Sequence, residues 1–229
     1  MPTNTITSFT DLADYIRDHP HFASSSLRAY FFKEAFTGSR FERLRSKDSN
    51  SITADDIVAV SMLSVEVPPR ASMSILGPGQ ASISLTLKTI SESHGLEHPD
   101  IDIKTGGQMW TLWRILSDLE GIGETICSKL LAAKRPLLFP IFDQHVGRAL
   151  SLKPTRYWEG WQEFLRTADG RRSVLTLNTM AEEIRLPSIS ALRLIDIVVW
   201  MQAHGYKFIT RDHVEAGRMI AVDYVDPLI

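Results

Sequence analysis

The sequence predicts an all-α fold, and three observations lead to this prediction. Helix-capping residues stand before apolar segments, as Ser8 and Thr53 do. Apolar residues recur at helical spacing over residues 107–119, where they make one apolar face. Residues 80–92 alternate in part like a strand, but a lone strand would have no partner, so we expect a helix there too.

Turn and breaker residues divide the chain into helices in order. His19-Pro20 ends the first helix, Gly38 ends the second, and Pro68-Pro69 ends the third. The expected helices cover residues 8–18, 26–37, 54–67, 70–76, 80–92, 107–119, 124–134, 143–152, 156–166, 171–185 and 189–204. Irregular segments are expected at 39–51 and 94–105, and a partly extended tail from Lys207.

Length and composition set limits on the class of protein. A chain of 229 residues can bury a full core, as one large domain or as two small interleaved ones. It has no run of eighteen apolar residues and no secretion signal in its first twenty, so we expect a cytoplasmic protein without a membrane span. The single cysteine, Cys127, excludes an internal disulfide and a four-cysteine iron–sulfur cluster.

Residues 119–148 carry the most informative pattern of the chain. Gly121 and Gly123 allow a tight turn and leave backbone N–H groups uncovered at the start of the next helix, where a phosphate can bind. Asp143 follows Gly123 by twenty residues, beyond that helix and a short apolar loop. The segment therefore offers a phosphate anchor and a carboxylate at a fixed distance from it.

This pattern resembles that of the helix-hairpin-helix DNA glycosylases, the superfamily of endonuclease III and the adenine-mismatch glycosylases. The family pattern is Leu-x-Gly-[Val/Ile]-Gly, a helix rich in small and apolar residues, a loop, and Asp-x-[His/Asn]-[Val/Ile]-x-Arg. The matching residues are Leu119, Gly121, Ile122, Gly123, Asp143, His145, Val146 and Arg148. Over most of its length the chain is also similar to a bacterial family of unknown function with the same hairpin.

The resemblance implies a particular domain organisation. An inner helical block, residues 52–142, would include the hairpin and pack against a second block formed by residues 1–51 and 143–229. Asp143 would lie at the edge of a cleft between the two interleaved blocks, and a flipped nucleotide would enter that cleft.

Asp143 is the expected catalytic residue. Cleavage of an N-glycosidic bond builds positive charge on the sugar, which a fixed carboxylate stabilises while it activates a water molecule. Members of the superfamily that also cut the strand carry a lysine where this chain has Thr125. The resemblance therefore implies a monofunctional glycosylase with water as nucleophile, and we expect no metal or other cofactor. As an alternative, Asp143 serves only as a helix N-cap.

DNA is the expected partner, although the net charge of the chain is −2. Residues 121–156 alone are net basic, with six basic and two acidic residues, which favours a phosphate contact there; the alternative is a solvated helix face. The expected DNA-binding residues are Gly121, Ile122, Gly123, Thr125, Lys129, His145 and Arg148.

Glu66, Trp110 and Trp113 are weaker candidates, for a base pocket. A carboxylate at Glu66 could accept from an amino group on a base, and a tryptophan could stack on it. The alternatives are a solvated helix end for Glu66 and core packing for the two tryptophans. His94 and His98 lie near Asp100, but this spacing matches no standard metal site.

Two hypotheses therefore compete. The first is a DNA base-excision glycosylase that removes a modified or damaged base with Asp143. The second is a non-catalytic helix-hairpin-helix module that binds DNA or a protein. The first predicts a cleft with Asp143 at its mouth, within about 15 Å of the hairpin amides. The second predicts Asp143 turned onto its own helix, with no base-sized pocket beside it.

Overall fold

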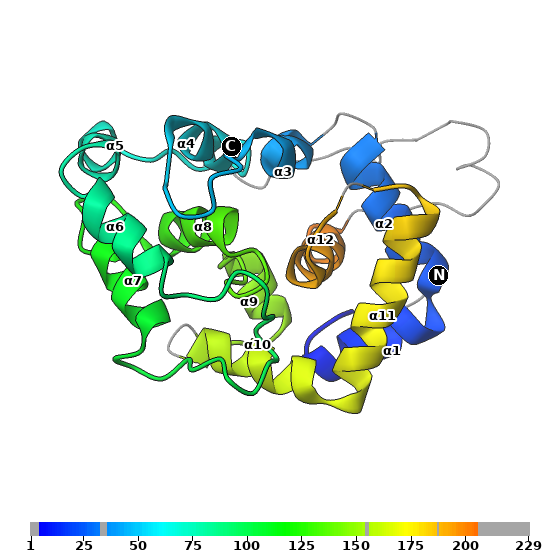
Figure 1. The fold of residues 1–229 in the computed structure, drawn as a ribbon. Helices are drawn as coiled ribbons and strands as arrows, with labels where there is room; N and C mark the ends of the chain where they lie inside the picture. Colours follow the sequence, from blue (N-terminus) through cyan, green and yellow to red (C-terminus); the bar gives the residue numbers. More distant parts are fainter. Residues whose placement is uncertain (1–4, 33–35, 154–155, 187, 206–229) are drawn as a thin grey trace.

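The computed structural model describes residues 5–32, 36–153, 156–186 and 188–205, and it confirms the all-α fold in these ranges (Figure 1). The helices are α1 (Phe9–Asp18), α2 (Pro20–Phe32), the 3-10 helix η1 (Thr37–Arg40), α3 (Phe41–Leu44), α4 (Ala54–Ser61), α5 (Pro69–Leu76), α6 (Gln80–Leu87), α7 (Gln108–Ser117), α8 (Glu124–Lys134), α9 (Gln144–Ala149), α10 (Tyr157–Arg166), α11 (Ala168–Glu183) and α12 (Ala191–Ala203). The tail expected from Lys207 lies outside the described residues.

The helices gather in two groups that the middle of the chain connects. In Figure 1, α4 to α8 lie together on the left, while α1, α2 and α11 lie on the right with α12 beside them. The helix α9 lies between the two groups near the centre of Figure 1, and α10 lies below it. Because α12 contacts α2, α9 and α11, both ends of the described chain pack against one another.

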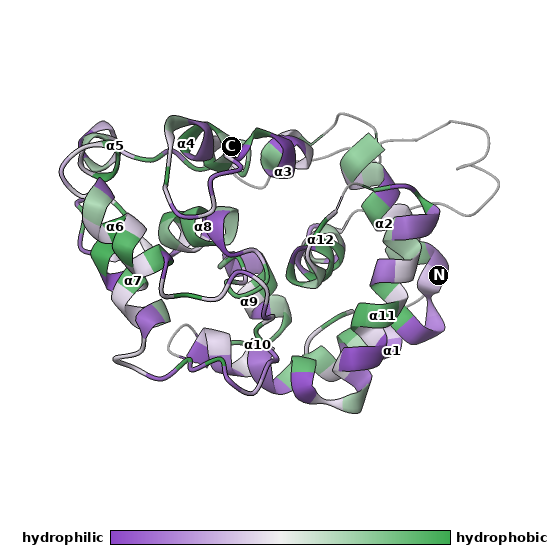
Figure 2. Ribbon diagram, viewed as in Figure 1, coloured by the Kyte–Doolittle hydropathy of each residue, from purple (hydrophilic) through white to green (hydrophobic). Residues whose placement is uncertain are grey.

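The central position of α12 follows from its composition. The helix is apolar almost all round, as its green ribbon in Figure 2 shows, and a helix of this kind is stable only when neighbours cover it. Two charged side chains, Arg193 and Asp196, interrupt this apolar surface and are also buried. They therefore need partners inside the protein.

The capping residues act as the sequence predicts. Ser8 accepts a hydrogen bond from the Asp11 amide at 3.1 Å and begins α1. Thr53 and Asp56 form a reciprocal capping box at the start of α4. Residues 80–87 form helix α6, so the strand-like alternation there was misleading.

Several helix boundaries differ from those expected: α6 ends at Leu87 rather than at residue 92, and the short helices η1 and α3 occupy part of the segment expected to be irregular. The second helix begins at Pro20 rather than near Ser26, because proline is well tolerated in the first helical turn. The helix α4 ends at Ser61 instead of continuing to residue 67, and Ser64 adopts a left-handed conformation with φ of 60°. The segment after α4 is therefore a loop, and it faces the cavity described below.

The basic residues at the C-terminal end of α8 are buried and form contacts inside the protein. Lys134 forms an ion pair with Asp56 at 2.6 Å, and neither side chain is exposed. The guanidinium of Arg135 donates hydrogen bonds to the main-chain oxygens of Ser49, Leu87 and other residues. These contacts join α8 to α4 and to the loops before α4 and after α6. None of the helices in the described ranges combines the length and the apolar character needed to cross a bilayer.

Candidate functional site

A cavity of about 510 Å³ lies where α2, α8, α9 and α12 meet. The loop that follows α4 and the 3-10 helix η1 complete its walls. Its lining therefore comes from parts of the chain that are far apart in sequence. The volume lies within the range of about 300–1,000 Å³ that is usual for small-molecule sites.

Asp143 lines this cavity and also caps its own helix. Its Oδ1 accepts hydrogen bonds from the amides of His145 at 2.8 Å and Val146 at 3.2 Å, as an N-cap does. No group among the described residues binds its other oxygen, Oδ2. The structure thus shows Asp143 as the N-cap of α9 through one oxygen, while the other oxygen has no partner among the described residues and the residue lines the cavity.

Lys129 faces the same cavity from α8. Its Nζ donates a hydrogen bond to the main-chain oxygen of Leu63 at 2.8 Å, and its side chain is buried. Burial lowers the pKa of Lys129, while the nearby charge of Asp143 acts in the opposite direction. The hydrogen bond also holds the loop after α4 against α8.

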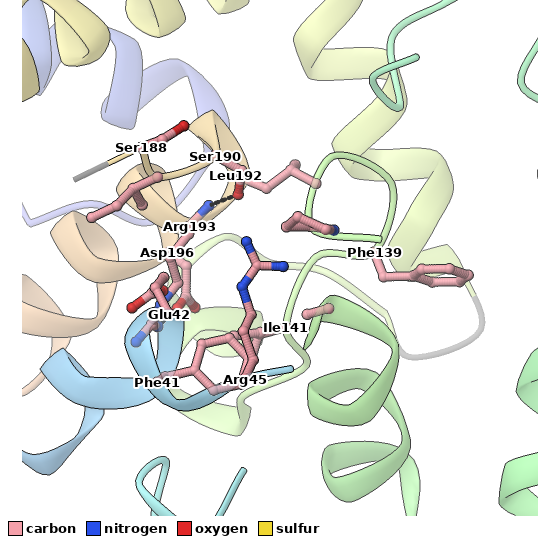
Figure 3. Close-up of a pocket in the computed structure, with 13 residues that line it drawn as sticks. Phe41, Glu42, Arg45, Phe139, Ile141, Ser188, Ser190, Leu192, Arg193 and Asp196 are labelled. Carbon is pink, nitrogen blue, oxygen red and sulfur yellow. Dashed lines mark hydrogen bonds and ion pairs between the residues drawn. The ribbon is translucent and has the colours of Figure 1, made fainter. Parts of the chain in front are cut away.

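A network around Arg193 forms the wall on the side of α12. Its guanidinium binds Asp196, Glu42 at 3.0 Å and the hydroxyl of Tyr30 at 2.6 Å. Figure 3 shows Arg193 and Asp196 near Glu42 beside a smaller cavity, and Arg193 and Asp196 line both this cavity and the large one. Three helices, α2, α3 and α12, are joined in this way.

Asp196 is a buried carboxyl group beside the cavity, and its pKa is raised. Arg193 binds its Oδ2, but its buried Oδ1 has no hydrogen-bond partner in the described structure. Burial is the largest cause that raises the pKa of Asp196 to about 6, and repulsion by Asp143 adds to it; Arg193 opposes both. The cavity therefore contains two carboxyl groups in different environments.

Five aromatic or imidazole rings form a continuous row along the cavity. Tyr30 and Phe36 stack almost in parallel with centroids 5.4 Å apart, and Trp200 meets Phe36 edge-on at 5.7 Å. His204 lies 4.2 Å from Trp200 and 4.2 Å from His145, which completes the row. Every one of these residues lines the cavity. A flat heteroaromatic ligand can stack on such a wall.

The glycine turn leads into α8, which carries two of the predicted site residues. Gly121 has φ of +82°, and a Cβ there would lie 2.7 Å from Cγ of Pro68, so glycine is required. Gly123 is the N-cap of α8 and faces open space. Thr125 and Lys129, one helical turn apart, both line the cavity. The glycine turn and the cavity are therefore connected by a single helix.

The other predicted DNA-binding residues are divided between core and surface. Ile122 is buried and packs in the hydrophobic core. His145 lines the cavity, whereas Arg148 is exposed on α9 and does not line it. Only part of this predicted set therefore lies at the cavity.

The residues considered for a base pocket lie elsewhere. Glu66 is exposed and does not line the cavity with Asp143. Trp110 and Trp113 pack against Trp158, and the Trp110 indole donates to the main-chain oxygen of Ile103 at 2.7 Å. These positions agree with the solvated and packed alternatives.

His94, His98 and Asp100 form a compact polar cluster in the loop before α7. One ligand atom from each lies within 4.8 Å of the others. The two imidazole rings, however, stack face to face, with centroids 3.8 Å apart and planes 9° from parallel. Since an imidazole lone pair lies in the ring plane, these rings as placed cannot both direct one at a single ion.

Sequence reasoning missed most of the aromatic row that lines the cavity. Tyr30, Phe36 and Trp200 carry no motif, and only tertiary packing brings them together. One local signal was present: Arg193 and Asp196 are three residues apart inside an otherwise apolar helix. Charged residues in such a place are expensive to bury, so they mark a structural or functional network.

Comparison with known proteins gives a family without an assigned activity. The model of a family of unknown function, DUF6308, matches residues 23–203. No curated protein and no solved structure matches the chain.

Proposed function

Since the chain belongs to DUF6308, a family of unknown function, we propose an activity from the site itself: hydrolysis of the N-glycosidic bond of a nucleoside unit, with Asp143 as the catalytic carboxylate. The observation that carries this proposal is the state of the Asp143 side chain. One oxygen is held by the helix that follows, and the other is uncommitted beside a cavity of about 510 Å³.

The chemistry follows from this arrangement. As the bond between C1′ and the base nitrogen breaks, its electron pair leaves with the base and positive charge develops on the sugar. The Asp143 carboxylate stabilises that charge and accepts a proton from the attacking water. Because the cap hydrogen bonds fix the carboxylate before the substrate binds, little reorganisation is needed during the reaction.

The row of rings supports binding of the base. Phe36 and Trp200 contribute aromatic faces, and stacking on an aromatic side chain stabilises a bound base by about 1–3 kcal/mol. With the base on this wall, the sugar would lie nearer to Asp143 on α9. We therefore assign the base-binding role to this wall rather than to Trp110 and Trp113.

The resemblance to the helix-hairpin-helix glycosylases supports the same chemistry. In that superfamily the hairpin amides hold a phosphate next to a flipped damaged base, and Gly123 is uncovered at the corresponding place here. Thr125 occupies the position of the strand-cutting lysine, so the proposed enzyme is monofunctional. The first N–H groups of α8 have no side-chain cap among the described residues, as that role requires, although the exposed acidic side chains around the turn oppose a phosphate there.

A second candidate function is a non-catalytic module that binds DNA or a protein. The observation in its favour is that Asp143 caps α9 with good geometry, which gives it a complete structural role. The two functions make opposite predictions for Asp143→Asn, because asparagine also caps helices well.

The proposal is tested with a panel of duplexes that contain uracil, hypoxanthine, alkylated purines, oxidised guanine or mismatched adenine. Wild type is compared with Asp143→Asn and with the exposed control Asp169→Asn, and alkali cuts any abasic product. We expect cleavage that needs alkali, is kept in Asp169→Asn and is lost in Asp143→Asn. Strand cutting without alkali would contradict the role given to Thr125. Binding without base release would favour the non-catalytic module.

A further inference from the structure

We infer that the nucleoside unit enters the cavity as a free, uncharged nucleoside rather than as a nucleotide flipped out of a duplex. This inference rests on the proposed function. The evidence is the set of partners that the charged side chains around the cavity and the glycine turn already have.

The basic residues that made the region of α8 look suited to DNA are largely inside the protein. Lys129, Lys134 and Arg135 are at most 5% exposed. Their charged groups are held by the oxygen of Leu63, the carboxylate of Asp56 and several main-chain oxygens. A phosphate on the surface cannot reach them without breaking these contacts. Three of the six basic residues between 121 and 156 are thus unavailable to a duplex.

The remaining three give a sparse positive surface. Arg156 is exposed and already paired with Glu163 at 3.0 Å. Arg148 and Lys153 are exposed without an ion pair among the described residues. Two free cations are few for a duplex site, because contacts between cations and phosphates supply most of the non-specific binding energy.

Acidic side chains surround the expected phosphate anchor. Asp118, Glu120 and Glu124 lie within seven residues across the glycine turn, and all three are exposed. Among the described residues, only Glu120 of these three forms an ion pair, with Arg70 at 3.8 Å, and both of these side chains are more than 80% exposed. A weak exposed pair of this kind neutralises little charge. The turn would therefore repel the negatively charged backbone of a duplex.

Among the described residues, the two cations that line the cavity, Lys129 and Arg193, already have partners. Arg193 is shared among Asp196, Glu42 and Tyr30, and Lys129 is bound to a main-chain oxygen. The described lining also holds two carboxyl groups, Asp143 and Asp196, which balance these two cations. An uncharged nucleoside fits this lining, with its base on the aromatic wall and its sugar hydroxyls beside carboxylates that accept hydrogen bonds. Each added phosphate would bring negative charge without a partner.

The test measures release of the free base by wild type from three substrate groups that carry the same bases. These are free ribo- and deoxyribonucleosides, their 5′-monophosphates, and duplexes that contain the base. We expect kcat/KM for a free nucleoside to exceed that for its monophosphate and for the duplex by at least tenfold. We also expect it to stay constant between 50 and 200 mM salt, since no phosphate contact is made.

The outcomes separate this inference from the proposed function. Turnover of duplex in preference to nucleoside, with a steep loss of activity in salt, would overturn the inference and leave the glycosidase proposal standing. Silence in all three groups would overturn both. A second test uses the double variant Asp118→Asn with Glu120→Gln, which removes two negative charges at the turn, and measures its duplex binding by fluorescence anisotropy at low salt. The variant should bind the duplex at least threefold more tightly without a change in nucleoside turnover. Unchanged duplex binding would contradict the repulsion at the turn.

Discussion

The ammonium group of Lys134 lies 2.6 Å from the carboxylate of Asp56, and neither side chain is exposed to solvent. Each charge has further partners: Nζ of Lys134 also donates to the main-chain oxygen of Asp48, and Asp56 accepts from the amides of Ser46 and Thr53. This pair joins α8, which carries the site residues Thr125 and Lys129, to α4.

Loss of one partner leaves the other charge buried without compensation. We therefore expect Lys134→Met to lower the free energy of unfolding by about 3–5 kcal/mol, measured by urea denaturation. The exposed control Lys153→Met should change it by less than about 0.5 kcal/mol. Equal effects from the two variants would show that the pair does not hold α8 in place.

The two glycines before α8 differ in what they tolerate. Gly121→Ala places a side chain at φ of +82° and against Pro68, so we expect a loss of about 1–2 kcal/mol or more. Gly123→Ala meets open space at φ of −82° and should change stability by less than about 0.5 kcal/mol. Thermal unfolding of the two variants side by side checks this, and a larger loss for Gly123→Ala would contradict the turn geometry.

The sequence predicts local features of the fold well, for physical reasons. Caps such as Ser8 and Thr53 act within one helical turn, and the glycine turn depends only on backbone conformation. The end of α4 was placed too late, because prolines at 68 and 69 mark where a helix must stop and not where it does stop. Tertiary contact decides the rest: Lys129 donates its hydrogen bond to Leu63, in the loop that replaces the expected helical turns.

The site was only partly predictable. Asp143 was found because a single sequence motif places it before a helix start and at a fixed spacing from the glycine turn. The aromatic row joins Tyr30 and Trp200, which are about 170 positions apart, and no pattern of spacing shows such a contact. The burial of Lys134 was equally invisible, since a lysine looks the same in the sequence whether it meets solvent or Asp56.

Because the pKa of Asp196 is raised in the folded protein, the free energy of unfolding should depend on pH. Burial raises this pKa to about 6 from 3.8, so between about pH 4 and pH 6 the native chain binds more protons than the unfolded chain. The free energy of unfolding that Asp196 contributes is therefore largest below this window and falls as the pH rises through it. The charged and titratable groups that act on Asp196 are Arg193, Asp143 and Lys129, and Tyr30 and Glu42 bind the same guanidinium.

Urea denaturation at a series of pH values tests this dependence. The stability of wild type relative to Asp196→Asn should decline between about pH 4 and pH 6 and level off above pH 7. The Asp169→Asn variant, whose carboxylate is exposed, is the control. A difference that rises with pH would show that Asp196 is stabilised in its ionised form, and a flat difference would show that it does not titrate in this range.

The two roles of Asp143 can be separated by two substitutions. Asn keeps an oxygen that caps α9, so Asp143→Asn should leave the melting temperature near that of wild type. Ala removes the cap, and Asp143→Ala should cost about 1 kcal/mol. Differential scanning calorimetry measures both, and equal losses would mean that the cap hydrogen bonds contribute nothing to stability.

The most direct test of the role of Asp143 is the rate at which free base appears, followed by liquid chromatography, for wild type, Asp143→Asn and Asp169→Asn on the same nucleosides and duplexes. We predict base release by wild type and Asp169→Asn, with a loss of about 10²–10⁴-fold in Asp143→Asn at unchanged stability. Equal rates in wild type and Asp143→Asn, or no base release from any substrate, would contradict this prediction.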